Sequence, residues 1–314
     1  MEICYAVCAA VMFGAGHYLS GTVSRRSGPL AVAYWTQYGV VLVAAALLLQ
    51  QPLPQTWSIP ALVWGVVAAL GGVAGSLCLY AALSRATFTL AVGASTVTAT
   101  VTPGLVAMSF LGEAITPVRL VLIGMAMLTV WLLVSQKRGD GTAAVVTSPL
   151  PVVTSSIPTV AAHGSLPEPR TQSRRGSAPL ALCAGLGYAV ELVGVAQIPG
   201  ETFTQGLLAW AAASFVVMLV LVLARRKGQL MPRGRGGALV LVAGGLSATG
   251  MLLFHLSASG VGLATTSAIV AVYPAVPILL AVAILRERPA RRGWAGLACA
   301  ASVVALGAAS TTLS

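Results

Sequence analysis

The sequence predicts an all-α membrane protein in which ten transmembrane helices form two inverted five-helix repeats around a central cavity. Three observations lead to this fold class. Hydrophobic residues make up 57% of the 314 residues and charged residues only 8%, whereas about a quarter of a soluble domain is charged. Ten apolar runs approach the length of about 20 residues that a helix needs to cross a bilayer. The chain also repeats one pattern at an interval of about 174 residues.

The ten runs are expected to be helices, because lipid offers the backbone no other hydrogen-bond partners. They lie at approximately 3–22, 30–50, 59–83, 87–111, 117–135, 179–198, 204–224, 236–258, 262–285 and 293–312. Between the fifth and the sixth, residues 136–178 are rich in Pro, Ser, Thr and Arg, and such a segment buries too little apolar surface to order itself. We therefore expect a first repeat at 1–135, a disordered cytoplasmic linker at 136–178 and a second repeat at 179–314.

The repeated pattern is clearest in the fourth and ninth runs. Pro103 matches Pro277, and Glu113 matches Glu287, at the same interval. An odd number of helices in each half turns the second half upside down in the membrane, which is the inverted-repeat design of many transporters. Each proline removes a backbone donor from its helix, so Pro103 and Pro277 are candidate hinges, with packing as the alternative. The two glutamates fall at helix ends and are expected to be interfacial anchors.

The distribution of basic residues predicts the orientation of the chain. Every Lys and Arg except Arg119 lies in the linker or in the loops that follow the first, third, seventh and ninth helices. Because basic loops remain in the cytoplasm, we predict a multi-pass protein of the inner cell membrane with both termini outside. The net charge of +11 does not predict nucleic-acid binding, since the charges are spread over short loops.

Three acidic or histidine residues lie far from the ends of predicted spans: Glu191 in the sixth, His17 in the first and His255 in the eighth. Each costs roughly 2.5–3.5 kcal/mol to insert, so each is a candidate for function. Because burial favours the neutral form of a carboxyl group, Glu191 could take up a proton on one side and release it on the other. The histidines could relay protons or bind a substrate carboxylate. The alternative for all three is a hydrogen-bonded packing role.

Aromatic and amide side chains near the middle of spans form a second group of candidates. Cavities for organic solutes are mostly apolar, with a few polar groups at defined places, and these residues would supply both. An orientation toward lipid is the alternative for the aromatic residues. The group comprises Trp35, Gln37, Tyr80, Tyr188, Trp210 and Tyr273.

The chain resembles the drug/metabolite transporter superfamily, and within it the ten-helix EamA-like permeases. The residues behind this resemblance are Pro103 with Leu111-Gly112-Glu113, and Pro277 with Leu285-Arg286-Glu287 and Gly296. The resemblance implies a secondary-active transporter that works by alternating access and exports amino acids or related metabolites. The long linker, and Phe13-Gly14 where relatives often have Trp-Gly, depart from the family pattern and leave the substrate open.

Motif searches narrow the remaining function classes. The phosphate-binding pattern Gly-x-x-x-x-Gly-Lys-Ser/Thr is absent, so we expect proton coupling or exchange rather than a self-contained ATP-driven pump. No spacing of Cys or His indicates a metal, and we expect no cofactor. The expected partners are a small-molecule substrate and the lipid bilayer, with the chain as a monomer or homodimer.

A membrane enzyme is not expected, because the catalytic patterns His-Glu-x-x-His and Gly-x-Ser-x-Gly are missing. The alternative is a non-transporting scaffold or sensor that uses the linker to bind a partner.

Overall fold

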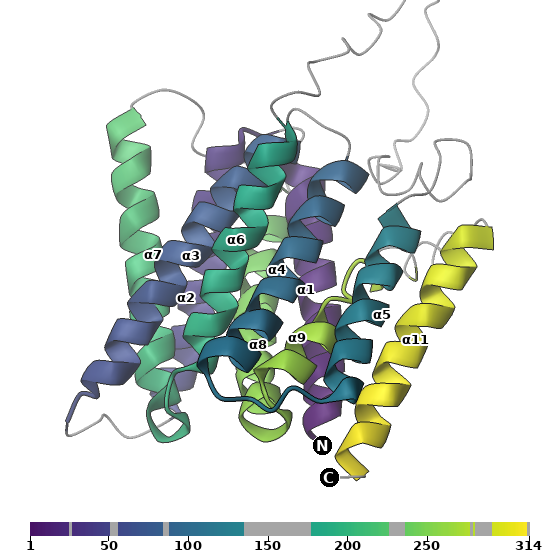
Figure 1. Ribbon diagram of the computed structural model, residues 1–314. Coiled ribbons are helices and arrows are strands. Elements are labelled where there is room, and N and C mark those ends of the chain that lie inside the picture. Colours follow the sequence, from purple (N-terminus) through teal and green to yellow (C-terminus); the bar gives the residue numbers. More distant parts are fainter. Residues whose placement is uncertain are drawn as a thin grey trace, which may run out of the picture.

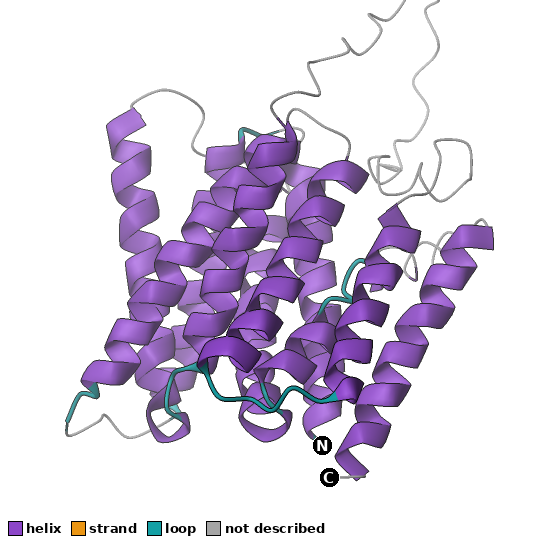
Figure 2. Cartoon of the chain, in the orientation of Figure 1, coloured by secondary structure: helices purple, strands orange, loops and turns teal. Residues whose placement is uncertain are grey.

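The computed structural model describes residues 1–24, 27–50, 56–83, 88–134, 177–225, 236–276, 279 and 291–312. These residues form ten α-helices and one short 3-10 helix (Figures 1 and 2). Seven of the helices are long and apolar enough to cross a membrane. The predicted all-α, multi-pass architecture is therefore confirmed.

The helices follow the predicted apolar runs closely. The first half contributes α1 (Glu2–Ser24), α2 (Pro29–Leu49), α3 (Ile59–Leu83), α4 (Phe88–Phe110) and α5 (Pro117–Val134). The second half contributes α6 (Ser177–Ala196), the 3-10 helix η2 (Gly200–Thr202), α7 (Phe203–Arg225), α8 (Gly236–Val261), α9 (Leu263–Val270) and α11 (Arg291–Thr312).

The predicted linker falls almost entirely outside the described residues. Its last two positions, 177 and 178, instead belong to α6, which begins at Ser177. Pro179 does not prevent this earlier start, because the N–H groups of the first helical turn have no helical partners in any case.

The helices of the two halves pack between one another. In the centre, α3 lies along α6 and α7, while α8 lies along α1 and α2. At one edge α5 and α11 pack side by side (Figure 1). Both termini lie at the same end of the bundle (Figure 1). Each half therefore needs the other to cover its inner surface.

Glycines allow α3 and α6 to approach closely. A Cβ atom on Gly187 of α6 would lie 2.7 Å from the Cα atom of Gly75, and one on Gly71 would lie 2.7 Å from the carbonyl oxygen of Gly187. Small residues at such a spacing let helix backbones touch in membranes. The Gly71–Gly75 pair therefore serves a contact within the chain.

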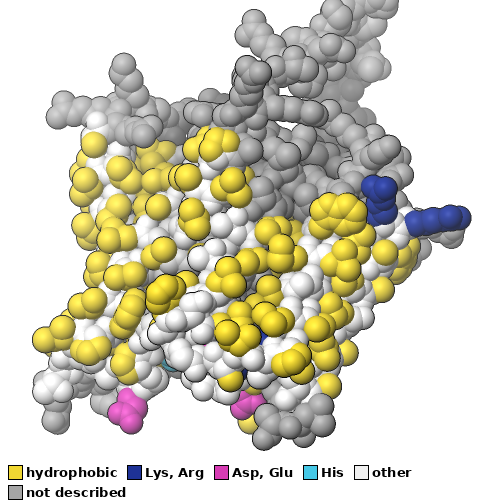
Figure 3. Space-filling model, in the orientation of Figure 1, with side chains coloured by type: hydrophobic (Ala, Val, Ile, Leu, Met, Phe, Trp, Pro, Cys, Tyr) yellow, Lys and Arg dark blue, Asp and Glu magenta, His cyan; other side chains and the backbone are white. Residues whose placement is uncertain are grey.

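The outer surface of the bundle is apolar. Exposed large hydrophobic side chains include Leu120, Leu128 and Trp131 on α5, and Val220 and Leu223 on α7. Figure 3 shows hydrophobic side chains over much of one face, with acidic side chains at its lower edge and basic ones at its upper right. An apolar surface of this extent fits lipid rather than water.

The ninth apolar run does not form the single helix predicted for 262–285. Instead α9 ends at Val270, and turns follow at 271–274. Pro274 accounts for the end, because it has no N–H to donate to Val270 and its ring crowds that carbonyl group. The backbone tightens there, so that Tyr273 N donates to Val270 O at 3.0 Å and Val276 N donates to Tyr273 O at 3.1 Å.

The two predicted hinge residues have different outcomes. Pro103 lies inside the continuous helix α4, and its role as a hinge stays a prediction. Pro277 lies outside the described residues, as does Glu287.

Glu113 joins the two halves at the end of the bundle where α9 begins. Its Oε1 atom accepts a hydrogen bond from Leu263 N at 2.6 Å, and its Oε2 atom accepts one from Ala264 N at 3.3 Å. The Arg119 Nη1 atom lies 3.6 Å from the same Oε2. The carboxylate satisfies backbone donors that the first turn of α9 would otherwise leave unpaired, and its negative charge suits a helix N-terminus.

Candidate functional site

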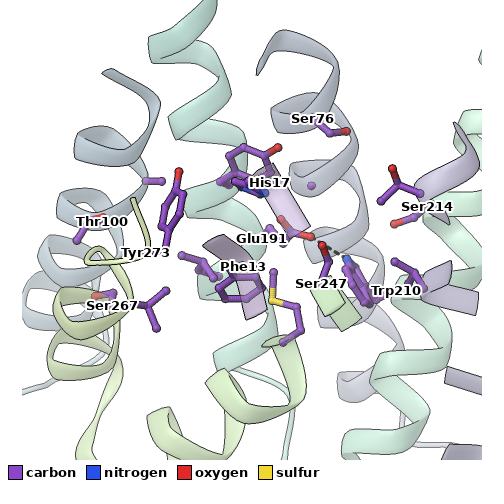
Figure 4. Close-up of a pocket in the computed structure, with 18 of the residues that line it drawn as sticks. Phe13, His17, Ser76, Thr100, Glu191, Trp210, Ser214, Ser247, Ser267 and Tyr273 are labelled. Carbon is purple, nitrogen blue, oxygen red and sulfur yellow. Dashed lines mark hydrogen bonds between the residues drawn. The ribbon is translucent and has the colours of Figure 1, made fainter. Parts of the chain in front are cut away.

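A cavity of about 100 Å³ lies among eight helices, four from each half. The helices α1 to α4 and α6 to α9 contribute to its wall, together with the turn after α9. Figure 4 shows side chains from both halves directed toward this common space. Seven of the nine predicted cavity residues line it, namely Glu191, His17, Gln37, Tyr80, Tyr188, Trp210 and Tyr273.

Glu191 is the acidic residue of the cavity wall. Its side chain is only 6% exposed, and its Oε1 atom accepts a hydrogen bond from Trp210 Nε1 at 3.1 Å (Figure 4). Gly72 of α3 leaves room for the carboxyl group, since a Cβ atom there would lie 2.6 Å from Glu191 Cδ. No Lys or Arg belongs to the cavity wall, so the carboxyl group faces the cavity without a cationic neighbour in the described part of the chain.

His17 lies between two tyrosines from the other half. Its ring centroid is 5.6 Å from that of Tyr188 and 5.2 Å from that of Tyr273. The hydroxyl of Tyr273 is hydrogen-bonded to Thr96 Oγ1 at 2.6 Å. Because Tyr273 belongs to the turn after α9, the break at Pro274 places an aromatic side chain and irregular backbone directly at the cavity.

Gln37 presents an unsatisfied acceptor. The side chain is 8% exposed, and its Oε1 atom has no hydrogen-bond partner among the described residues. Buried polar atoms in native proteins nearly always have a partner, and an exception calls for an explanation. An acceptor on a cavity wall fits a site in which a bound solute supplies the donor.

Two predicted residues lie away from the cavity wall. Trp35 precedes Gln37 by two positions, so the two side chains lie on different sides of the helix. The Trp35 ring stacks on that of Tyr38, with ring centroids 4.9 Å apart. His255 lies one turn beyond Met251 of the cavity wall. There its ring stacks on that of Phe203 at 4.0 Å, and its Nδ1 atom is 3.1 Å from Val195 O. For both residues the structure shows packing contacts.

Several lining residues were not among the predicted ones, including Phe13, Ser76 and Ser214. Single Ser and Phe residues are common in membrane helices, so their identity alone gave no signal. Their spacing did contain one. Each lies four positions from a predicted residue, respectively His17, Tyr80 and Trp210, and that spacing places two side chains on one helix face.

Comparison with known proteins gives the fold but no family. No family model matches the sequence, and no curated protein matches it. Among solved structures 23 chains match. One, described only as the crystal structure of a protein, covers 98% of this chain and 95% of its own length at 19% identity, with a TM-score of 0.62. The chain is a multi-pass helical membrane protein. At this identity the likeness extends to the fold alone.

Proposed function

We propose that this protein is a secondary-active transporter that carries a small organic solute by alternating access. The observation behind the proposal is the cavity shared by four helices of each half, with the buried carboxyl group of Glu191 in its wall. A site between two halves is what alternating access needs, because rocking one half against the other opens it to either side in turn.

We propose that the halves form an inverted repeat, as the resemblance to the EamA-like, drug/metabolite transporter type implies, and the packing of the helices supports a two-fold relation between them. In such a repeat α1 corresponds to α6, α2 to α7 and α3 to α8. The contact of α3 with α6 then has its counterpart in α8 with α1, and that of α3 with α7 in α8 with α2. Reciprocal contacts of this kind are expected when a two-fold axis exchanges the halves. Tyr188 follows Phe13 by 175 positions, close to the interval of the repeated pattern, and both residues line the cavity.

The interrupted helix α9 is a second feature that favours transport. Carriers commonly place discontinuous helices at the substrate site, where the freed backbone and side chains contact the solute. Here the interruption lies at 271–274, and Ala271 and Tyr273 both belong to the cavity wall. A solute in the cavity would therefore contact a segment whose backbone is not held by a regular helix.

We further propose that Glu191 couples transport to protons. Its carboxyl group accepts one neutral hydrogen bond, from Trp210, and faces the cavity, so it can exchange a proton with whichever side the cavity meets. The basic loops and the linker would lie in the cytoplasm, and family resemblance favours export. The proposal assigns no catalytic residue.

Flux through proteoliposomes tests this function. Purified protein would be reconstituted, and the release of labelled amino acids, nucleosides and organic amines would be followed with and without a pH gradient. We expect flux of at least one class, with rates that depend on the gradient. The Glu191→Gln variant should lose this pH dependence, while Glu201→Gln, which alters an exposed acid in η2, should keep it.

Two results would contradict the proposal at different levels. Unchanged pH dependence in Glu191→Gln would remove the coupling role of this residue. Absence of flux for all three solute classes in the reconstituted wild-type protein would contradict transport of small organic solutes.

A further inference from the structure

The polar groups of the cavity indicate what kind of solute it holds. We propose that the site selects a small organic ammonium ion with N–H donors and no carboxylate, bound between Glu191 and Gln37. This inference deepens the proposed function and rests on it. It differs from the family expectation of amino acid transport, because an amino acid brings a carboxylate that needs a partner of its own.

The charges of the wall favour a cation. Among the described residues of the wall, Glu191 is the one acid, and no Lys or Arg accompanies it. A bound ammonium ion would give the buried carboxylate the opposite charge that it lacks in the described structure. A solute with a carboxylate would instead place like charges in one small cavity. In the described wall, the side chain that could become a cation to receive it is His17, which lies between two tyrosines.

The hydroxyl groups of the wall favour a solute that donates hydrogen bonds. Thr36, Ser76, Thr100, Ser247 and Ser267 each donate to a carbonyl oxygen of their own helix, at 2.7 to 3.2 Å. With their protons directed at the backbone, these hydroxyls can offer only lone pairs to a solute.

The amide of Gln37 adds a further acceptor to these hydroxyls, because its Oε1 atom is buried and unpaired in the described structure. Much of the wall therefore accepts hydrogen bonds. An ammonium group matches it well, because it has several N–H donors and no acceptor.

Size and aromatic content agree with this chemistry. The cavity volume of about 100 Å³ is well below the roughly 300–1,000 Å³ typical of sites for drug-sized ligands, so a short amine fits better than a large one. Aromatic rings of Phe13, Tyr80, Tyr188, Trp210 and Tyr273 belong to the wall. Cations within about 6 Å of such ring centroids are attracted to the ring face.

A set of matched probes tests the charge and the donor requirement separately. The set is n-butylamine, n-butanol as a neutral analogue, tetramethylammonium as a cation without N–H groups, butyrate as an anion and 4-aminobutyrate as a zwitterion. Binding to the full chain in nanodiscs would be measured by calorimetry at neutral pH, where butylamine is charged. We expect butylamine to bind at least about tenfold more tightly than each of the others, since a factor of ten corresponds to one hydrogen bond to a charged group.

Variants locate the binding. Glu191→Gln should lose most of the affinity for butylamine, and Gln37→Leu should reduce it about tenfold. Glu201→Gln, away from the cavity, should bind as the wild type does. Equal or tighter binding of butyrate or 4-aminobutyrate by the wild type would overturn the inference, as would unchanged butylamine affinity in Glu191→Gln. The wild-type comparison does not depend on how well any variant folds.

Binding and flux together separate this inference from the proposed function. Butylamine binding without flux in proteoliposomes would support the cation site and contradict transport. Flux of another solute, with no binding of butylamine, would support transport and overturn the cation site.

Discussion

Gly71 and Gly72 are neighbours in α3, yet the same change to alanine should affect them differently. A Cβ atom on Gly71 would lie 2.7 Å from Glu191 N and from Gly187 O, whereas ordinary contacts are 3.4–4 Å. Both atoms are backbone of α6, so the two helices would have to separate. A Cβ atom on Gly72 would meet the Glu191 carboxyl group, with Cδ at 2.6 Å, and a side-chain end can rotate away.

The magnitudes follow from these contacts. Relief of the Gly71 contact requires a shift of about 0.7 Å, from 2.7 to 3.4 Å, and a gap of that size forfeits about a quarter to a half of the dispersion energy of each contact. Overpacking of this kind costs about 1–3 kcal/mol, and alanine regains about 1 kcal/mol of helix propensity. With two backbone atoms involved, we expect Gly71→Ala to be destabilised by about 2 kcal/mol, and Gly72→Ala to stay within about 1 kcal/mol of the wild type.

Thermal unfolding in detergent, together with flux and butylamine binding, distinguishes the two variants. Gly71→Ala should have a Tm at least about 4 °C below that of the wild type, since about 2 °C corresponds to 1 kcal/mol in a chain of this size. Gly72→Ala should keep its Tm but lose binding and flux, because the carboxyl group is displaced. Gly124→Ala in α5 is the control, since a Cβ atom there meets nothing within 4 Å. A Tm of Gly71→Ala equal to that of this control would refute the reasoning. Butylamine affinity of Gly72→Ala equal to that of the wild type would also refute it.

Two further predictions concern Glu113 and the two histidines. Glu113→Ala removes the acceptor for Leu263 N and Ala264 N, and we expect the free energy of unfolding to fall by about 1–2 kcal/mol. A Tm equal to that of the wild type would contradict this role. Glu201→Gln is the control, because it alters an exposed acid. His255→Phe should retain flux, because the histidine ring stacks on Phe203 away from the cavity. His17→Phe should reduce flux, because His17 lines the cavity. Lower flux in His255→Phe than in His17→Phe would contradict both assignments.

Much of the fold could be predicted because lipid leaves an apolar run few alternatives to a helix. The break in α9 could not, although Pro274 is visible in the sequence. Pro103 stands inside α4 without ending it, so a proline alone does not decide between a continuous and an interrupted helix. The outcome depends on whether neighbouring groups satisfy the freed backbone, and those neighbours come from other parts of the chain.

The candidate site was predictable where residue type was decisive. A carboxyl group in the middle of an apolar span costs free energy wherever it faces lipid, and Glu191 lies in the cavity wall. Aromatic residues are less constrained: Trp210 lies in the cavity wall, whereas Trp35 stacks on Tyr38 outside it. Gly72 of α3 leaves space for the carboxyl group of Glu191 on α6. This contact between two distant parts of the sequence is visible only in the folded structure.

The pair of α5 and α11 has a mechanical consequence under the proposed repeat. These helices are counterparts of each other, so exchanging the halves maps their contact onto itself. The contacts of α3 with α6 and of α8 with α1 are exchanged instead, and each takes the place of the other. A cycle that interchanges the conformations of the halves can leave the α5–α11 contact unaltered. The contact of α5 with α11 can therefore persist through the cycle, while the contacts of α3 with α6 and of α8 with α1 alternate.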